Sequence, residues 1–211
     1  MHAGERPDPE QLLAEARQGR SDRLGALLEL YRNYLRLLAR TQIDLHVQGR
    51  VNPSDLVQET FLEAHRDFDQ FRGRTEQEWL AWLRRILVHN LARLVDQQVK
   101  ALKRNARREV SLDRLARGSL DQTSARFDAA LVSPHSSPSE QAQRREQTAL
   151  MADRLAVLPA HYRDVIVLRN LEGLSFDEVA RRMGRTPGAV RQLWLRALDR
   201  LRKLHEREDI T

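Results

Sequence analysis

The stretch LSFDEVARRMGRTPGAVRQLWLRALDRLRK, residues 174–203, contains the local signals that decide the fold. Ser175 and Glu178 have the spacing of a capping box, which predicts that a helix begins directly after the serine. This helix should end at Gly184, because glycine adopts the left-handed conformation that closes many helices. Thr186 can cap a second helix immediately afterwards. Two helices joined by so short a glycine-containing turn match a helix-turn-helix.

The second helix of this stretch has two chemically different faces. Apolar residues recur at intervals of three and four and predict a core-facing side, made of Val190, Leu193, Trp194, Ala197, Leu198 and Leu201. The opposite side is placed where a recognition helix meets base edges in the major groove, and it presents Thr186, Pro187, Gly188, Arg191, Gln192, Leu195 and Arg196. The alternative is a plain helical hairpin with a solvated basic face. The agreement of capping box, turn glycine and basic outer face favours the DNA-binding motif.

Composition favours an all-α protein. Hydrophobic residues make up 41% of the 211-residue chain but aromatic residues only 5%, and abundant Leu, Ala, Arg and Glu favour helix. The absence of cysteine excludes disulfides, cysteine-ligated zinc and cysteine nucleophiles, and fits a reducing cytosol. The seven histidines are scattered, without the spacing of a metal site. We therefore expect neither a metal nor a cofactor.

The N-terminal stretch MHAGERPDPE lacks the apolar region of a signal peptide. No window approaches the roughly 20 apolar residues of a membrane span. We therefore expect a cytoplasmic protein without a membrane span.

Helical signals recur through the first half of the chain. An apolar-periodic helix is expected over 24–43, and Asn52 can cap the next helix with Pro53 in its first turn. Thr75 and Glu78 form another capping box, which opens a long third helix. The apolar residues of that helix recur every three or four positions; they are Trp79, Trp82, Leu83, Ile86, Leu87, Leu91 and Leu94.

A linker is expected between two helical domains. Helical periodicity fades over 111–139, and VSPHSSPS at 132–139 is rich in residues that compete with helix for the backbone. Ser137 and Glu140 then supply a capping box for the next helix. The prediction is therefore an all-α protein of two small helical domains, 1–110 and 140–211, joined by a flexible linker, 111–139. The second domain contains the helix-turn-helix.

The helix predicted at SDLVQETFLEAH, residues 54–65, carries an acidic strip on a basic protein. The chain has 36 Lys and Arg against 30 Asp and Glu, a formal net charge of +6, which favours an anionic partner. Helical periodicity defines a core-facing side, consisting of Val57, Phe61, Ala64 and Phe68. The opposite side collects Asp55, Gln58, Glu59 and Arg66, with the apolar Leu62 among them. A mixed strip of this kind indicates a docking surface rather than a solvated face.

The far end of the third helix is strongly basic. The residues concerned are Lys100, Lys103, Arg104, Arg107 and Arg108. A charge run alone is compatible with solvated surface, but a helix-turn-helix in the same chain favours phosphate contact.

These motifs resemble the extracytoplasmic-function (ECF) class of bacterial RNA polymerase sigma factors. The resemblance rests on DLVQETF at 55–61, WLAWLRRILVHN at 79–90, LPAHYRDVIVLRNLEGLSFDEVARRMG at 158–184 and VRQLWLRALDRLR at 190–202. They are similar to that family's second and fourth regions, in the same order and separation, and the chain lacks space for its first and third regions. Two positions depart from the family pattern: Leu94, where Asp is usual, and Leu193, where Arg is frequent.

The resemblance implies roles for particular residues. In that family the strip docks on the clamp-helix coiled coil of the largest polymerase subunit, which would here involve Asp55, Gln58, Glu59 and Leu62. The melted non-template strand of the minus-ten element would be bound by Phe71, Arg72, Arg74, Asn90, Lys103, Arg104, Arg107 and Arg108. The minus-thirty-five duplex would be read by the recognition helix. The implied partners are core RNA polymerase and promoter DNA, with an anti-sigma factor as a further candidate.

Three functions can be compared at this point. A sigma factor would bind core polymerase and direct promoter-specific initiation. A two-domain helix-turn-helix regulator that is not a polymerase subunit would also explain the C-terminal half, but it leaves the DLVQETF strip unexplained. An enzyme is disfavoured because the sequence has no glycine-rich phosphate loop, nucleophile triad or paired carboxylates.

Overall fold

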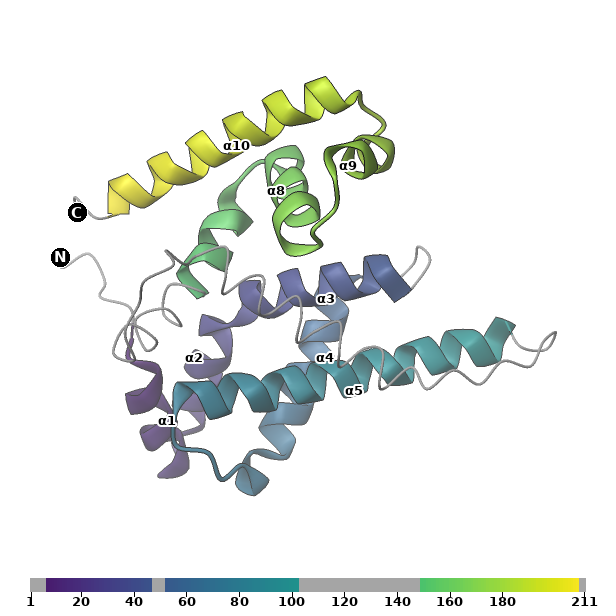
Figure 1. Ribbon diagram of the computed structural model, residues 1–211. Coiled ribbons are helices and arrows are strands. Elements are labelled where there is room, and N and C mark those ends of the chain that lie inside the picture. Colours follow the sequence, from purple (N-terminus) through teal and green to yellow (C-terminus); the bar gives the residue numbers. More distant parts are fainter. Residues whose placement is uncertain (1–6, 47–51, 103–148, 209–211) are drawn as a thin grey trace. The chain divides into compact units, whose positions relative to one another are not determined.

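A computed structural model describes residues 7–46, 52–102 and 149–208 (Figure 1). Within these ranges all regular structure is helical, which confirms the predicted fold class. The helices form two compact units, with α1–α5 in one and α8–α10 in the other. Their bounds are α1 Pro9–Arg17, α2 Ser21–Leu30, α3 Arg32–His46, α4 Pro53–Arg66, η1 Phe68–Gln70, α5 Glu76–Leu102, α8 Ala160–Ile166, η2 Val167–Leu171, α9 Phe176–Met183 and α10 Pro187–Glu208, with a further helical stretch at 149–157.

The predicted domain limits at 110 and 139 and the capping box at Ser137 lie outside the described residues. Two helical units are confirmed; where one ends and the next begins stays a prediction.

The single helix predicted over 24–43 is two helices. Tyr31 separates α2 from α3, with backbone angles of φ −110° and ψ 5°. Its side chain is fully buried, and its hydroxyl donates a hydrogen bond to the Glu76 carboxylate at 2.5 Å. The apolar spacing runs through the break without interruption, so periodicity alone could not locate it.

Helix α1 was not predicted from the sequence. Its start has local signals, because the Asp8 carboxylate accepts a hydrogen bond from the Glu10 amide at 2.9 Å and Pro9 occupies the first turn. Leu12, Leu13 and Ala16 are buried on one side of α1, which packs against α2.

Helix α4 packs between α3 and α5. The Asn52 side chain caps it by accepting from the Ser54 amide at 3.0 Å, as predicted. The buried side is wider than the predicted stripe because two helices contact α4: Val57 and Ala64 are buried as expected, and so are Leu56 and Thr60. Phe61 and Phe68 were expected in the core but are only half-buried.

Four aromatic rings pack together where the chain enters α5. Trp79 is fully buried, with its ring centroid 5.4 Å from that of Phe71 and 5.3 Å from that of Trp82. Phe68 adds an edge contact to Trp79 at 6.0 Å. The segment that precedes α5 is therefore anchored by aromatic packing.

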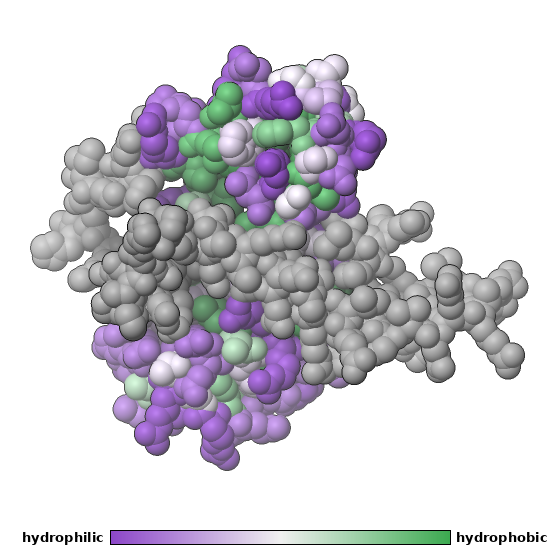
Figure 2. Space-filling model, viewed as in Figure 1, coloured by the Kyte–Doolittle hydropathy of each residue, from purple (hydrophilic) through white to green (hydrophobic). Residues whose placement is uncertain are grey.

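In the second unit, α10 packs against α8 and α9. Ala180 and Val190 are buried at the helix crossing, as the sequence predicted. Leu193, Ala197 and Leu201 are also buried, whereas Trp194 and Leu198 are half-buried. On the face shown in Figure 2 the surface of the α1–α5 unit is mainly hydrophilic, and that of α8–α10 has apolar patches among hydrophilic side chains. In the described part of the chain no helix is both long and apolar enough to cross a bilayer.

Candidate nucleic-acid interface and docking face

The helix-turn-helix has the local geometry that its sequence predicts. The Ser175 hydroxyl accepts from the Glu178 amide at 3.3 Å, and the Glu178 carboxylate accepts from the Ser175 amide at 2.7 Å. The Ser175 hydroxyl also donates to the Glu178 carboxylate at 2.7 Å. This bond, and after it the bond from the Ser175 backbone N–H, lowers the pKa of Glu178. Gly184 closes α9 at φ +63°, and the Thr186 hydroxyl accepts from the Ala189 amide at 3.3 Å at the start of α10.

The predicted recognition face is open to solvent. All seven residues of this face are exposed: Thr186, Pro187, Gly188, Arg191, Gln192, Leu195 and Arg196. Leu195 keeps 54% of its surface accessible. None of the seven belongs to the core, and their contact with a duplex stays a prediction.

Phe176 orients Arg191 and was not identified from the sequence. The Arg191 guanidinium lies over the Phe176 ring at 5.3 Å, and Arg169 lies over the same ring at 4.9 Å. Such cation–π contacts restrict the rotamers of a long side chain. Arg191 is thus held against the first residue of α9.

Two polar contacts join the helices of the helix-turn-helix to the segment that precedes them, one from α10 and one from α9. The Trp194 indole N–H donates to the Asn170 side-chain oxygen at 2.9 Å. Asn170 belongs to η2, one π-helical turn after α8, and π-turns of this kind often mark functional sites. Arg182 of α9 donates to the buried Glu172 carboxylate at 2.5 Å. Neither Asn170 nor Glu172 carried a motif that would have singled it out.

The segment Phe71–Thr75 forms a tightly held loop before α5. The Glu78 carboxylate accepts from the backbone N–H groups of Arg74 at 2.8 Å and Thr75 at 3.1 Å. These two backbone bonds, with the Thr75 hydroxyl, lower the pKa of Glu78. A Cβ on Gly73 would lie 2.4 Å from the Phe71 ring, so no side chain fits there.

The predicted minus-ten residues fall into different environments. Arg72 and Arg74 are exposed on the loop, whereas Phe71 is 8% exposed and belongs to the aromatic cluster. Asn90 is 3% exposed on α5, and its amide has no hydrogen-bond partner among the described residues. The remaining four residues lie outside the described part of the chain: Lys103, Arg104, Arg107 and Arg108.

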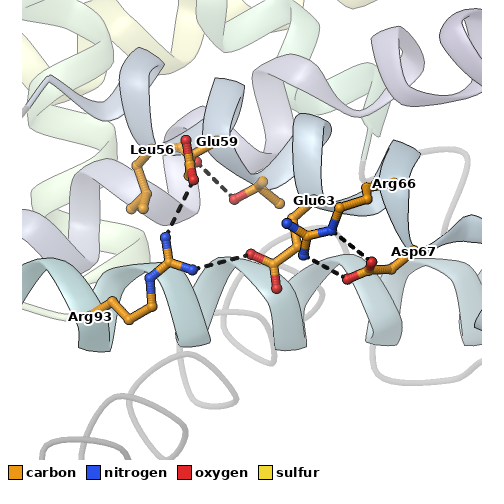
Figure 3. Close-up of polar contacts among 7 residues, drawn as sticks. Leu56, Glu59, Glu63, Arg66, Asp67 and Arg93 are labelled. Carbon is orange, nitrogen blue, oxygen red and sulfur yellow. Dashed lines mark hydrogen bonds and ion pairs between the residues drawn. The ribbon is translucent and has the colours of Figure 1, made fainter.

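The acidic strip on α4 faces solvent, and one intramolecular contact bridges it. Asp55, Gln58 and Glu59 are exposed, and Leu62 keeps 62% of its surface accessible. Figure 3 shows Arg93 of α5 between Glu59, at 3.3 Å, and Glu63, at 3.8 Å. Arg93 and Glu59 are both about half exposed, so this ion pair is weak. No motif singled out Arg93.

Two family models match the chain in the order that the motifs imply. The model of sigma-70 region 2 matches residues 30–107, and that of sigma-70 region 4 matches residues 149–201. The first match takes in α3, α4 and α5, and the second takes in the helix-turn-helix. The two units therefore have the make-up of a sigma-70-type protein.

Curated relatives narrow this class. ECF RNA polymerase sigma factor SigD of Mycobacterium tuberculosis is 29% identical over 94% of this chain and 84% of its own. ECF RNA polymerase sigma-E factor of Salmonella typhimurium is 31% identical over 68% of each chain. The protein belongs to the ECF family of RNA polymerase sigma factors. A solved structure titled "Structure of CnrH in complex with the cytosolic domain of CnrY" aligns with 94% of this chain and 98% of its own, at 25% identity and a TM-score of 0.35.

The region 2 match also decides between the functions compared above. A helix-turn-helix regulator outside the polymerase accounts for the match at 149–201 but not for the match at 30–107. The sigma-factor interpretation accounts for both.

Proposed function

We propose that this chain is the promoter-specificity subunit of a bacterial RNA polymerase. It binds core polymerase, recognises the minus-ten and minus-thirty-five elements, and performs no covalent chemistry of its own. The observation that carries this proposal is the presence of region 2 and region 4, in order, on two separate helical units. Its place of action is the cytoplasm, where the polymerase works, and an anti-sigma factor is a further proposed partner.

The recognition face of α10 is the proposed reader of the minus-thirty-five duplex. Arg191, Gln192 and Arg196 are exposed near the start of α10 and carry long side-chain donors. Arginine donates to two acceptors of guanine at once, and glutamine pairs similarly with adenine. Thr186, Pro187 and Gly188 bring the backbone at the start of the helix close to the DNA, and Leu195 supplies an apolar contact.

The loop Phe71–Thr75 is the proposed contact for the melted minus-ten strand. Arg72 and Arg74 extend into solvent from a backbone that is held in place, which suits binding of a flexible single strand. Phe71 contributes by anchoring the loop, because its ring is buried. Asn90 can contact DNA only if its side-chain amide becomes accessible. The proposed role of the basic run is to bind phosphates; it consists of Lys103, Arg104, Arg107 and Arg108.

The α4 strip is the proposed docking face for core polymerase. It combines carboxylates and an amide with the exposed apolar Leu62, a mixture that suits a protein partner better than DNA. A basic residue of the partner can replace Arg93 as the partner of Glu59, so that the carboxylate remains paired on binding.

Reconstitution with core polymerase tests the proposal. The wild-type chain should co-elute with core polymerase on gel filtration without DNA. The complex should then initiate on members of a randomised promoter library that share two sequence blocks. A chain that ignores polymerase but binds duplex DNA alone as a dimer would instead support the regulator alternative.

A further inference from the structure

We propose that Arg17 is a positioning residue for the minus-ten loop, and that α1 thereby takes part in promoter specificity. The inference rests on the proposed function, since it assumes that Phe71–Thr75 contacts the minus-ten strand. Helix α1 precedes the matched region 2, which begins at residue 30. The matched region 2 therefore contains the acceptors of this contact, Phe71 and Gly73, but not its donor, Arg17.

Arg17 holds the loop by its backbone carbonyls. Its Nη2 atom donates to the carbonyl of Phe71 at 3.2 Å and to the carbonyl of Gly73 at 2.5 Å. The guanidinium also lies 5.7 Å from the centroid of the Phe71 ring. These contacts fix the Phe71–Arg72 and Gly73–Arg74 peptide groups. Arg72, the first exposed basic residue of the loop, lies between them.

Two side chains hold the backbone of the loop, one through its N–H groups and the other through its carbonyls. On the amide side, the Glu78 carboxylate of α5 accepts from the N–H groups of Arg74 and Thr75. On the carbonyl side, Arg17 is the described donor. Without Arg17, water replaces it as the hydrogen-bond donor to the carbonyls of Phe71 and Gly73. The first half of the loop then gains conformational freedom. Ordering the loop before DNA arrives reduces the entropy lost on binding.

The role of Arg17 is separable from the stability of α1. The Arg17 side chain is exposed, and α1 is held to α2 by the buried Leu12, Leu13 and Ala16. A second, weaker tie joins α1 to the start of α5, where the Glu10 carboxylate accepts from the Glu76 amide at 3.4 Å. Replacing Arg17 should therefore loosen the loop while α1 stays packed.

A neighbouring arginine provides a matched control. Arg20 carries the same charge, pairs with Glu15 at 3.0 Å and Asp22 at 3.7 Å, and has no described contact with the loop. Arg17→Ala removes a charge from the last residue of α1, and Arg20→Ala removes the same charge three residues later, at the N-cap of α2. Arg17→Lys keeps the charge and an N–H donor but loses the planar stacking on Phe71.

Hydrogen exchange of the full-length protein tests the positioning step without DNA. Within 72–75 the amides of Arg74 and Thr75 donate to Glu78, and Arg17→Ala should speed the exchange of these two amides by about tenfold, a factor that corresponds to about 1.4 kcal/mol. Arg20→Ala should leave this exchange at the wild-type rate, and Arg17→Lys should fall between the two. Thermal melting should be the same for all. Unchanged exchange at 72–75 in Arg17→Ala would overturn the proposal.

Discrimination by the reconstituted holoenzyme tests the consequence. The probe is a single-stranded non-template oligonucleotide that carries the minus-ten block selected from the promoter library, compared with a scrambled one. In Arg17→Ala the preference for the selected oligonucleotide over the scrambled one should fall about tenfold. Arg17→Lys should retain most of this preference. Binding of either variant to a minus-thirty-five duplex should not change. A full preference in Arg17→Ala would refute the role in specificity. If the wild-type holoenzyme itself shows no preference, the proposed function fails, and the exchange experiment still reports on Arg17.

Discussion

The two proposed DNA-contacting regions are held in place in different ways. The helix-turn-helix depends on contacts between residues that are near in sequence: Ser175 with Glu178, Arg182 with Glu172 at a separation of 10 residues, and Trp194 with Asn170 at 24. The minus-ten loop depends on α1, through bonds that span 54 and 56 residues. Loss of tertiary packing in the α1–α5 unit should therefore disturb the loop, whereas the recognition helix depends on its own surroundings.

The largest effect should come from the aromatic core beneath the loop. Trp79→Ala removes a fully buried ring that contacts Phe68, Phe71 and Trp82, and it should lower the unfolding free energy by about 3–5 kcal/mol. Urea denaturation followed by circular dichroism measures this loss. Hydrogen exchange should show faster exchange in α1–α5 and unchanged exchange in α9 and α10.

Trp79→Phe serves as the control for that variant. The Trp79 indole N–H is buried and has no hydrogen-bond partner among the described residues, so phenylalanine loses no bond and keeps much of the apolar contact. Its loss should be well below that of Trp79→Ala. Equal destabilisation of both helical units by Trp79→Ala would contradict the prediction that the recognition helix depends on its own surroundings.

The second effect concerns the recognition face. Arg191→Ala should weaken minus-thirty-five binding by about 1–3 kcal/mol if the side chain contacts a base, and Arg196→Ala should act in the same way. Fluorescence anisotropy with the selected duplex measures this, with Arg200→Ala as a control at an exposed position farther along α10. Equal loss on selected and random duplexes, with a shallower salt dependence, would reassign the residue to phosphate contact.

A smaller effect should follow from loss of the bond between Trp194 and Asn170. Trp194→Phe removes the bond to Asn170 and leaves the Asn170 oxygen without that donor, which should cost about 0.5–1.5 kcal/mol of stability. It should also weaken minus-thirty-five binding and leave minus-ten discrimination unchanged. The same substitution at Trp79 breaks no described hydrogen bond. Comparing Trp194→Phe with Trp79→Phe therefore shows what an indole hydrogen bond contributes to stability. A Trp194→Phe protein with wild-type melting and wild-type duplex affinity would show that the bond to Asn170 does not support the recognition helix.

The smallest expected effect is on the melting temperature at acidic pH. The pKa values of Glu78 and Glu178 are both lowered in the folded protein by hydrogen bonds from the backbone and from Thr75 or Ser175. A lowered pKa means that each carboxylate stabilises the fold fully above its ordinary value of 4.5 and loses that contribution as the pH falls below it. Glutamine keeps an acceptor for the capping bonds but does not titrate. Glu78→Gln and Glu178→Gln should each make the fall in melting temperature below pH 4.5 less steep. An unchanged slope would argue against a contribution of the ionised carboxylate to stability.

The helix-turn-helix was predictable because its determinants are local. A capping box, a glycine at positive φ and an apolar repeat are each written in a few consecutive residues, and Ser175, Gly184 and Val190 behave as expected. The same holds for the caps at Asn52 and Thr75.

The features that were missed depend on contacts between distant segments. The break at Tyr31 is accompanied by a bond to Glu76, 45 residues away, and no local signal at Tyr31 announces it. Arg17 is an ordinary exposed arginine until the fold brings it to the loop. Phe61 was expected in the core because periodicity defines only one side of α4, whereas α3 and α5 cover two.

The central claim is that one chain docks on polymerase through α4 while its other surfaces read DNA. The direct measurement is gel filtration of core polymerase with a triple variant, Asp55→Ala, Gln58→Ala and Glu59→Ala. None of these side chains is buried, so the loss of stability should be limited to about 0.3–1 kcal/mol for the helix-dipole interaction of Asp55 and at most about 1 kcal/mol for the exposed Glu59–Arg93 pair. Arg93→Ala is the matched control, because it breaks the same ion pair and leaves the strip intact. The account predicts that the triple variant folds and melts nearly as the wild-type protein does but no longer co-elutes with polymerase, while Arg93→Ala still does. A folded triple variant that binds polymerase as tightly as the wild-type protein and supports promoter-directed transcription would contradict it.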